Sequence, residues 1–130
     1  MYQTDYILRL IEDAARFLAG ILSAQKIGKQ KDALEMIYTA YQSVFAIDKN
    51  EIETKSIQDI ILHFQENNKN SMPLIELFSD FLQEEANVTN SLSLYQKSFE
   101  LLSYIDQNDK ETFSLSRKNK LEKLSEILKH

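Results

Sequence analysis

Few side chains in this sequence could bind a metal ion or act as a base, and they lie far apart along the chain. The two histidines are His63 and His130, and Glu66 is the only carboxylate that lies three or four residues after either of them, a spacing typical of helical metal sites. A four-helix diiron site needs two such pairs and two further glutamates. Because the chain has no cysteine, thiolate ligands are also excluded. The sequence therefore predicts no metal site and a surface position for His63.

The motifs that bind phosphate or present a nucleophile are absent as well. The sequence contains no Gly-x-x-x-x-Gly-Lys, Gly-x-Ser-x-Gly or Gly-x-Gly-x-x-Gly. Two segments, Asp48-Lys49-Asn50 and Asp106-Gln107-Asn108, begin like a calcium loop, but both lack the glycine at its sixth position and the glutamate at its twelfth. We interpret both as polar helix ends. We expect no catalytic residue and no cofactor, and we predict that the protein is not an enzyme.

Positive charge is concentrated at the end of the chain. Residues 1–109 contain 9 basic and 17 acidic side chains, whereas residues 110–130 contain 6 and 3. The cations expected on the last helix are Arg117, Lys118, Lys120, Lys123 and Lys129. Nucleic-acid binding usually combines such cations with aromatic or amide side chains, and only Phe113 and Asn119 are close. We expect a charged face that covers an acidic body, with nucleic-acid binding as the alternative.

The composition favours an all-α protein. Two glycines and one proline among 130 residues are too few for the turns of an all-β fold, and this length suits one domain, 1–130, without disulfides. Apolar residues at helical spacing predict about six helices, at 4–24, 31–47, 55–68, 72–86, 89–106 and 113–129. Gly28 is expected to end the first helix, Ser56 to cap the third, and Pro73 to open the fourth.

The first predicted helix has a wide apolar side. Its inward stripe is Ile7, Leu10, Ile11, Ala14, Leu18, Ile21 and Leu22. Leu8, Ala15 and Phe17 widen this stripe, which predicts that other elements contact the helix on more than one side.

Charged residues interrupt this helix, and no segment reaches the roughly 18 apolar residues of a membrane span. We therefore expect a cytoplasmic protein without a membrane segment.

One helical passage occurs twice. Ala33–Asn50 aligns without gaps with Ser91–Asn108, and both end in Ile-Asp-x-Asn. In this alignment Ala33 and Ala40 fall on Ser91 and Ser98, which predicts that these small residues lie at close helix–helix contacts. Lys97, beside Ser98, is expected to face solvent.

The segment Gly28–Ala40 resembles the turn and second helix of a tetratricopeptide repeat, because Gly28, Ala33 and Ala40 stand at the spacing of that repeat. The resemblance implies stacked antiparallel hairpins. Since the period here is 58 residues, we expect two such hairpins, separated by one helix and closed by a C-terminal capping helix.

The start of the chain is similar to a family of short bacterial proteins that begin Met-Tyr-Gln-x-Asp-Tyr-Ile, followed by an arginine and an acidic residue. The matching residues are Tyr2, Gln3, Asp5, Tyr6, Ile7, Arg9 and Glu12. The resemblance implies a bacterial cytoplasmic protein. Because that family is a domain of unknown function, the resemblance transfers no site.

Together these features predict an interaction module whose partner is a protein or peptide. A second copy of the chain is one such partner. The candidate partner surface consists of Arg9, Arg16, Tyr38 and Tyr104. Because Tyr38 and Tyr41 point to different sides of one helix, we expect one of them to be partly exposed. A further alternative is a helical enzyme or small-ligand binder, in which Arg9 and Arg16 would hold an anion.

Overall fold

The computed structural model describes residues 2–67, 71–109 and 114–129, and these residues form seven helices and no strand. The helices are α1 (Tyr2–Lys26), α2 (Gln30–Ser43), α3 (Lys49–Thr54), α4 (Ile57–Asn67), α5 (Met72–Thr89), α6 (Leu92–Asn108) and α7 (Leu115–Lys129). The all-α prediction is therefore confirmed. The expected count was one helix short, because α3 was not predicted.

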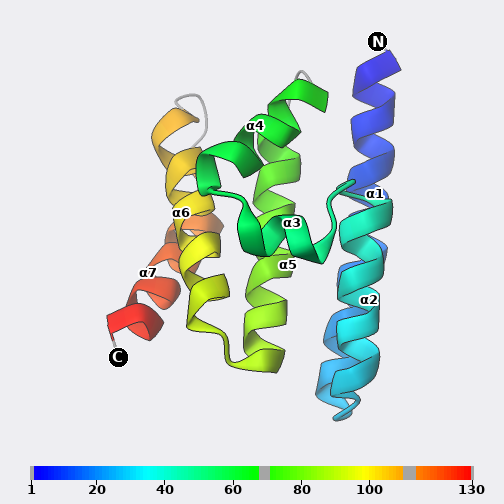
Figure 1. Ribbon diagram of the computed structural model, residues 1–130, viewed down its shortest axis with the longest axis vertical. Helices are drawn as coiled ribbons and strands as arrows, with labels where there is room; N and C mark the ends of the chain where they lie inside the picture. Colours follow the sequence, from blue (N-terminus) through cyan, green and yellow to red (C-terminus); the bar gives the residue numbers. More distant parts are fainter. Residues whose placement is uncertain (1, 68–70, 110–113, 130) are drawn as a thin grey trace.

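Two antiparallel hairpins, α1–α2 and α5–α6, dominate the arrangement (Figure 1). Helix α5 lies at the centre, where it packs against α1 and α2 on one side and α6 on the other. Helix α4 packs on α5 and α6, and α7 packs on α6. The α1–α2 hairpin thus contacts the α5–α6 hairpin through α5.

Aromatic rings fill the space where α2, α4 and α5 meet. Phe45, which follows α2, lies with its ring centroid 5.3 Å from that of Phe78 and 5.2 Å from that of Phe81. Phe64 of α4 reaches the same group, 5.2 Å from Phe78. Such aromatic contacts add to the large apolar area that each ring buries. This cluster fixes α4 and the end of α2 to the central helix.

The end of α2 differs from the prediction. The helix stops at Ser43 rather than at residue 47, and Ala46 then adopts a positive φ of 54° that redirects the chain. Asp48 caps α3, because its side chain accepts the Glu51 backbone N–H while the Glu51 side chain accepts the Asp48 N–H. The prediction that Asp48 ends a helix is wrong, since it begins one.

The repeated passages are consequently alike only in their first parts. Ile47–Asn50 leads into α3, whereas Ile105–Asn108 forms the last turn of α6. Thr89, expected at the start of the fifth predicted helix, is instead the last residue of α5, and Asn90 makes the turn with a φ of 57°. Asparagine tolerates this left-handed conformation better than most residues.

The small residues of the repeat are buried as expected, with one exception. Ala33, Ala40 and Ser98 are fully buried. The Ser98 Oγ lies 3.0 Å from the Ser79 Oγ and donates to the Ser79 carbonyl oxygen at 2.9 Å, which brings α5 and α6 close together. Ser91 instead caps α6, where its Oγ accepts the Leu94 N–H at 3.2 Å.

Candidate functional site

The outer side of α1 presents apolar side chains to solvent. Leu8 is 51% exposed and Leu22 is 48% exposed, and both Ala15 and Ala19 between them are exposed. Leu8, Ala15 and Leu22 are seven residues apart, or two helical turns, so they lie on one side of the helix over about 21 Å. We call these four residues the Leu8–Leu22 face. The opposite side of α1 packs into the core through Ile7, Leu10, Ala14, Ile21 and Ala24.

This face answers one sequence prediction and corrects another. Leu8 and Ala15 were expected to be contacted from a second side, yet the described part of the chain leaves them exposed. The prediction that Leu22 points inward is wrong, because Ile21 and Ala24 form that part of the core side of α1. Periodicity could not separate these residues, since apolar side chains surround most of the helix.

Charged residues of both signs surround the Leu8–Leu22 face. Asp5, Arg9, Glu12, Arg16 and Lys26 are all exposed on α1. Arg16 forms an ion pair with Asp13, three residues earlier in the same helix. Two residues of the predicted partner surface, Arg9 and Arg16, therefore lie beside the exposed apolar residues.

The other two residues of that predicted surface lie elsewhere. Tyr38 is 38% exposed on α2, and its hydroxyl reaches the Glu85 Oε2 at 3.4 Å. Tyr104 is half-buried on α6, where its hydroxyl accepts a hydrogen bond of 2.9 Å from the Gln65 Nε2 on α4. The four predicted residues thus occupy three helices and do not form one continuous surface. The expected difference between Tyr38 and Tyr41 is confirmed, because Tyr41 is buried.

A polar pocket of about 440 Å³ lies between the two hairpins, and Tyr38, Lys49, Glu85, Ser93 and Lys97 are among the residues that line it. The Glu85 carboxylate is only 2% exposed. It accepts a hydrogen bond of 2.7 Å from the Tyr41 hydroxyl and forms an ion pair of 2.6 Å with the Lys49 Nζ. Burial first, and then the Glu85 charge, raise the pKa of Tyr41 well above its usual value, so this hydroxyl stays protonated.

Lys97 closes one side of this pocket. Its Nζ donates to the carbonyl oxygen of Ile52 and lies 3.5 Å from that of Glu53, both in the last turn of α3. Burial and the nearby Lys49 charge lower the pKa of Lys97. A cation in this position satisfies carbonyl groups that end a helix without backbone partners. The prediction that Lys97 faces solvent is therefore wrong, and no local pattern reveals a contact with α3 45 residues away.

Three basic residues of α7 bind acidic residues of other segments of the same protein. Arg117 is only 5% exposed, and its Nη2 lies 3.0 Å from the Glu76 Oε1 and 3.4 Å from the Asp109 Oδ2. Two further pairs hold α7 to its neighbours, namely Lys118–Asp106 at 2.6 Å and Lys120–Asp80 at 2.9 Å. These pairs agree with the expectation of a charged face over an acidic body. They also reduce the positive charge available to nucleic acid.

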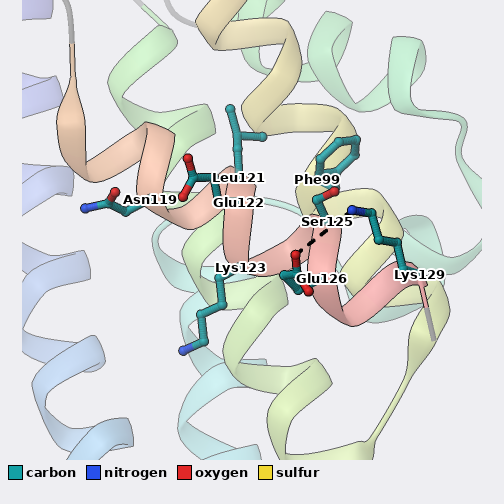
Figure 2. A pocket seen from close by; sticks show the side chains of 8 residues that line it. All are labelled: Phe99, Asn119, Leu121, Glu122, Lys123, Ser125, Glu126 and Lys129. Carbon is teal, nitrogen blue, oxygen red and sulfur yellow. Dashed lines mark ion pairs between the residues drawn. The ribbon is translucent and has the colours of Figure 1, made fainter.

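A groove of about 760 Å³ is lined by residues of α7 and by Phe99 of α6 (Figure 2). The side chain of Lys123 extends away from the Phe99 ring. Lys129 points toward Glu126, with 4.0 Å between the Nζ and the Oε1. Charges of both signs and a single aromatic ring do not make the stacking surface that single-stranded nucleic acid requires.

The described residues contain no group of three His, Cys, Asp or Glu side chains that could hold a metal ion. His63 is half-buried rather than on the open surface, because its Nε2 lies 3.1 Å from the Phe45 carbonyl oxygen and its ring packs edge-on against Phe64. His63 thus contributes to the packing of α4 against the end of α2.

Comparisons with known protein families, with curated proteins and with solved structures each found no match. Among the helices of the described residues, none has the length and apolar character needed to cross a membrane.

Proposed function

We propose that this protein is a protein-interaction module and that its partner binds the Leu8–Leu22 face. One observation carries the proposal. Leu8 and Leu22 are each about half exposed and lie two helical turns before and after Ala15, while the other side of the same helix packs into the core. Single exposed leucines are ordinary on protein surfaces, but an aligned group is typical of a contact surface.

The side chains of this face suit a partner that presents a helix. Ala15 and Ala19 at its middle are small enough to let another backbone approach closely, and Leu8 and Leu22 give apolar contacts at its ends. Arg9, Glu12 and Arg16 supply the polar rim that surrounds the apolar centre of many interfaces.

The wider interpretation belongs to the same proposal. The two antiparallel hairpins, packed against each other through α5, support a tetratricopeptide-like arrangement, a class of helical repeat that usually binds proteins. We likewise propose a bacterial, cytoplasmic setting, on the resemblance of the first residues.

Site-specific photo-crosslinking tests the proposal. A benzoylphenylalanine placed at Leu8 or Leu22 and irradiated in cells should give a discrete adduct that disappears when Arg16 and Ala15 are both changed to glutamate. The matched control is the same probe at Leu62, a leucine of α4 that is 50% exposed. Adducts that are absent at Leu8 and Leu22, or equally abundant at Leu62, would show that the face has no partner.

A further inference from the structure

We infer that the partner is a second copy of this chain, bound with the two α1 helices antiparallel and centred on Ala15. This inference rests on the proposed function of the Leu8–Leu22 face and names its occupant. It follows from how the residues of the face are distributed along the helix.

The spacing of the apolar residues is self-complementary. In an antiparallel pair centred on Ala15, Leu8 lies opposite Leu22 of the partner subunit, and Leu22 lies opposite the partner's Leu8. The two Ala15 residues then meet at the two-fold axis, where small side chains permit the closest approach. The same patch thus contacts itself, as a two-fold symmetric interface requires.

The charges are complementary in the same register. Asp5 and Lys26 lie on the same side of the helix as Ala19, exposed and 21 residues apart, or roughly 31 Å along the axis, so they cannot pair within one chain. The antiparallel register places Asp5 beside Lys26 of the partner subunit, and it does so twice.

A parallel pair would have the opposite result. It would bring Asp5 against Asp5 and Lys26 against Lys26, and like charges placed opposite each other disfavour association. The charges therefore select the antiparallel arrangement.

The same charges argue against other occupants. A lipid surface or a nucleic acid attracts surfaces on which cations dominate, whereas the rim here contains acidic Asp5 and Glu12 among its cations. A mixed rim that matches itself after a two-fold rotation favours a second copy.

The interface is small, so the association is expected to be weak. Two leucines and two alanines from each chain cover less area than a standard interface. A dissociation constant on the order of 10–100 µM is reasonable for such a contact. Concentration series must therefore extend to about 1 mM, well above that range.

Sedimentation equilibrium of the full chain, with a charge exchange, tests the register. Asp5→Lys and Lys26→Asp should each weaken self-association by about tenfold, because each variant alone places like charges together twice. An equimolar mixture of the two variants should associate as well as the unmodified chain, because both contacts then pair opposite charges.

Two results would overturn the inference. One is a chain that stays monomeric to about 1 mM, and the other is a mixture that associates no better than its components. If Asp5→Lys instead associates best with the unmodified chain, the helices pair in parallel and the antiparallel register is wrong.

A second substitution separates this inference from the proposed function. Leu8→Glu should abolish self-association, whereas Leu62→Glu, at a similarly exposed leucine, should not. Circular dichroism verifies that both variants fold. A monomeric chain whose Leu8 crosslinks to a different protein would contradict self-association and leave the proposed function intact. Loss of every adduct at Leu8 and Leu22 would contradict both.

Discussion

The Tyr41 hydroxyl donates a hydrogen bond of 2.7 Å to the Glu85 carboxylate, and both side chains are almost completely buried. This contact joins α2 to α5 and therefore joins the two hairpins. The Glu85 carboxylate also forms an ion pair with Lys49 and accepts a longer hydrogen bond from the Tyr38 hydroxyl. A buried charge with several donors is stable only as long as those donors remain.

Tyr41→Phe should destabilise the protein more than Tyr38→Phe. The first substitution removes the short hydrogen bond to a buried carboxylate, which typically costs about 1–3 kcal/mol. The second removes a contact of 3.4 Å at a partly exposed ring, so its effect should be within about 0.5 kcal/mol. Urea denaturation at neutral pH measures both. Equal losses would indicate that the Tyr41 hydroxyl does not support Glu85.

Asp80→Asn should be tolerated, although it removes an ion pair with Lys120. Burial first, and then the Glu76 and Glu84 charges, raise the pKa of Asp80 above its ordinary 3.8, although Lys120 lowers it. The folded state therefore holds this proton more tightly than the unfolded state, and stability from this group falls as pH rises from 3.8 through the raised pKa. Above that pKa the asparagine variant should be at least as stable as the unmodified protein.

Melting temperatures measured from about pH 4 to 7 test this sign. The difference in favour of Asp80→Asn should grow as pH rises. If Asp80→Asn instead becomes progressively less stable than the unmodified protein at higher pH, attraction by Lys120 has a larger effect on the pKa of Asp80 than burial has.

Arg117→Ala should release α7 from the body of the protein. It leaves Glu76, Asp106 and Asp109 without the buried guanidinium that lies between them, at a cost of about 2 kcal/mol. Limited trypsin digestion should then cut first within α7, after Lys118 or Lys120. Lys123→Ala is the control, and its digestion rate at those two sites should match that of the unmodified chain.

Ala40→Leu and Ser98→Leu should each destabilise the fold by about 1–3 kcal/mol, because a larger side chain must force two helices apart. Ser98→Leu also removes the hydrogen bond to the Ser79 carbonyl. The melting temperature should fall by roughly 3–6 °C per kcal/mol at this size. Gln96→Leu, at an exposed position of α6, should change it little. Neutral results at Ala40 and Ser98 would show that these sites accommodate a larger residue.

Ala46→Gly should stabilise the protein by up to about 1 kcal/mol, since alanine pays a steric cost at a φ of 54° that glycine avoids. Gln42→Gly, in the helical and exposed part of α2, should have the opposite sign. Thermal unfolding of both variants gives the comparison. Destabilisation at Ala46 would contradict the strained turn.

The sequence predicted the fold class because the signals involved are local and numerous. Gly28, Ser56 and Pro73 mark helix boundaries that the structure reproduces: Gly28 has a φ of 81°, the Ser56 Oγ accepts the Asp59 N–H, and Pro73 lies in the first turn of α5. Helix α3 escaped prediction because six residues are too few to show a period, although its capping pair, Asp48 and Glu51, was visible in the sequence.

The candidate site could be predicted only in part. Arg9 and Arg16 were correctly placed outside the core, because charged side chains are rarely fully buried unless they are paired. The exposure of Leu22 depends on which side of α1 meets α5, and the burial of Glu85 depends on residues more than thirty positions away. Such contacts are set by tertiary packing and leave no trace in a local pattern.

The central position of α5 bears on the order in which the chain can fold during synthesis. Tyr41 and Glu85 are separated by 44 residues, so the α1–α2 hairpin is complete well before the helix that covers it exists. At ordinary rates of translation this interval lasts roughly 2 to 9 s. During that time the inner side of the hairpin, including Ala14, Ile37 and Tyr41, has no native neighbour beyond the hairpin itself. The nascent chain is therefore most exposed to aggregation or to chaperone binding before α5 leaves the ribosome.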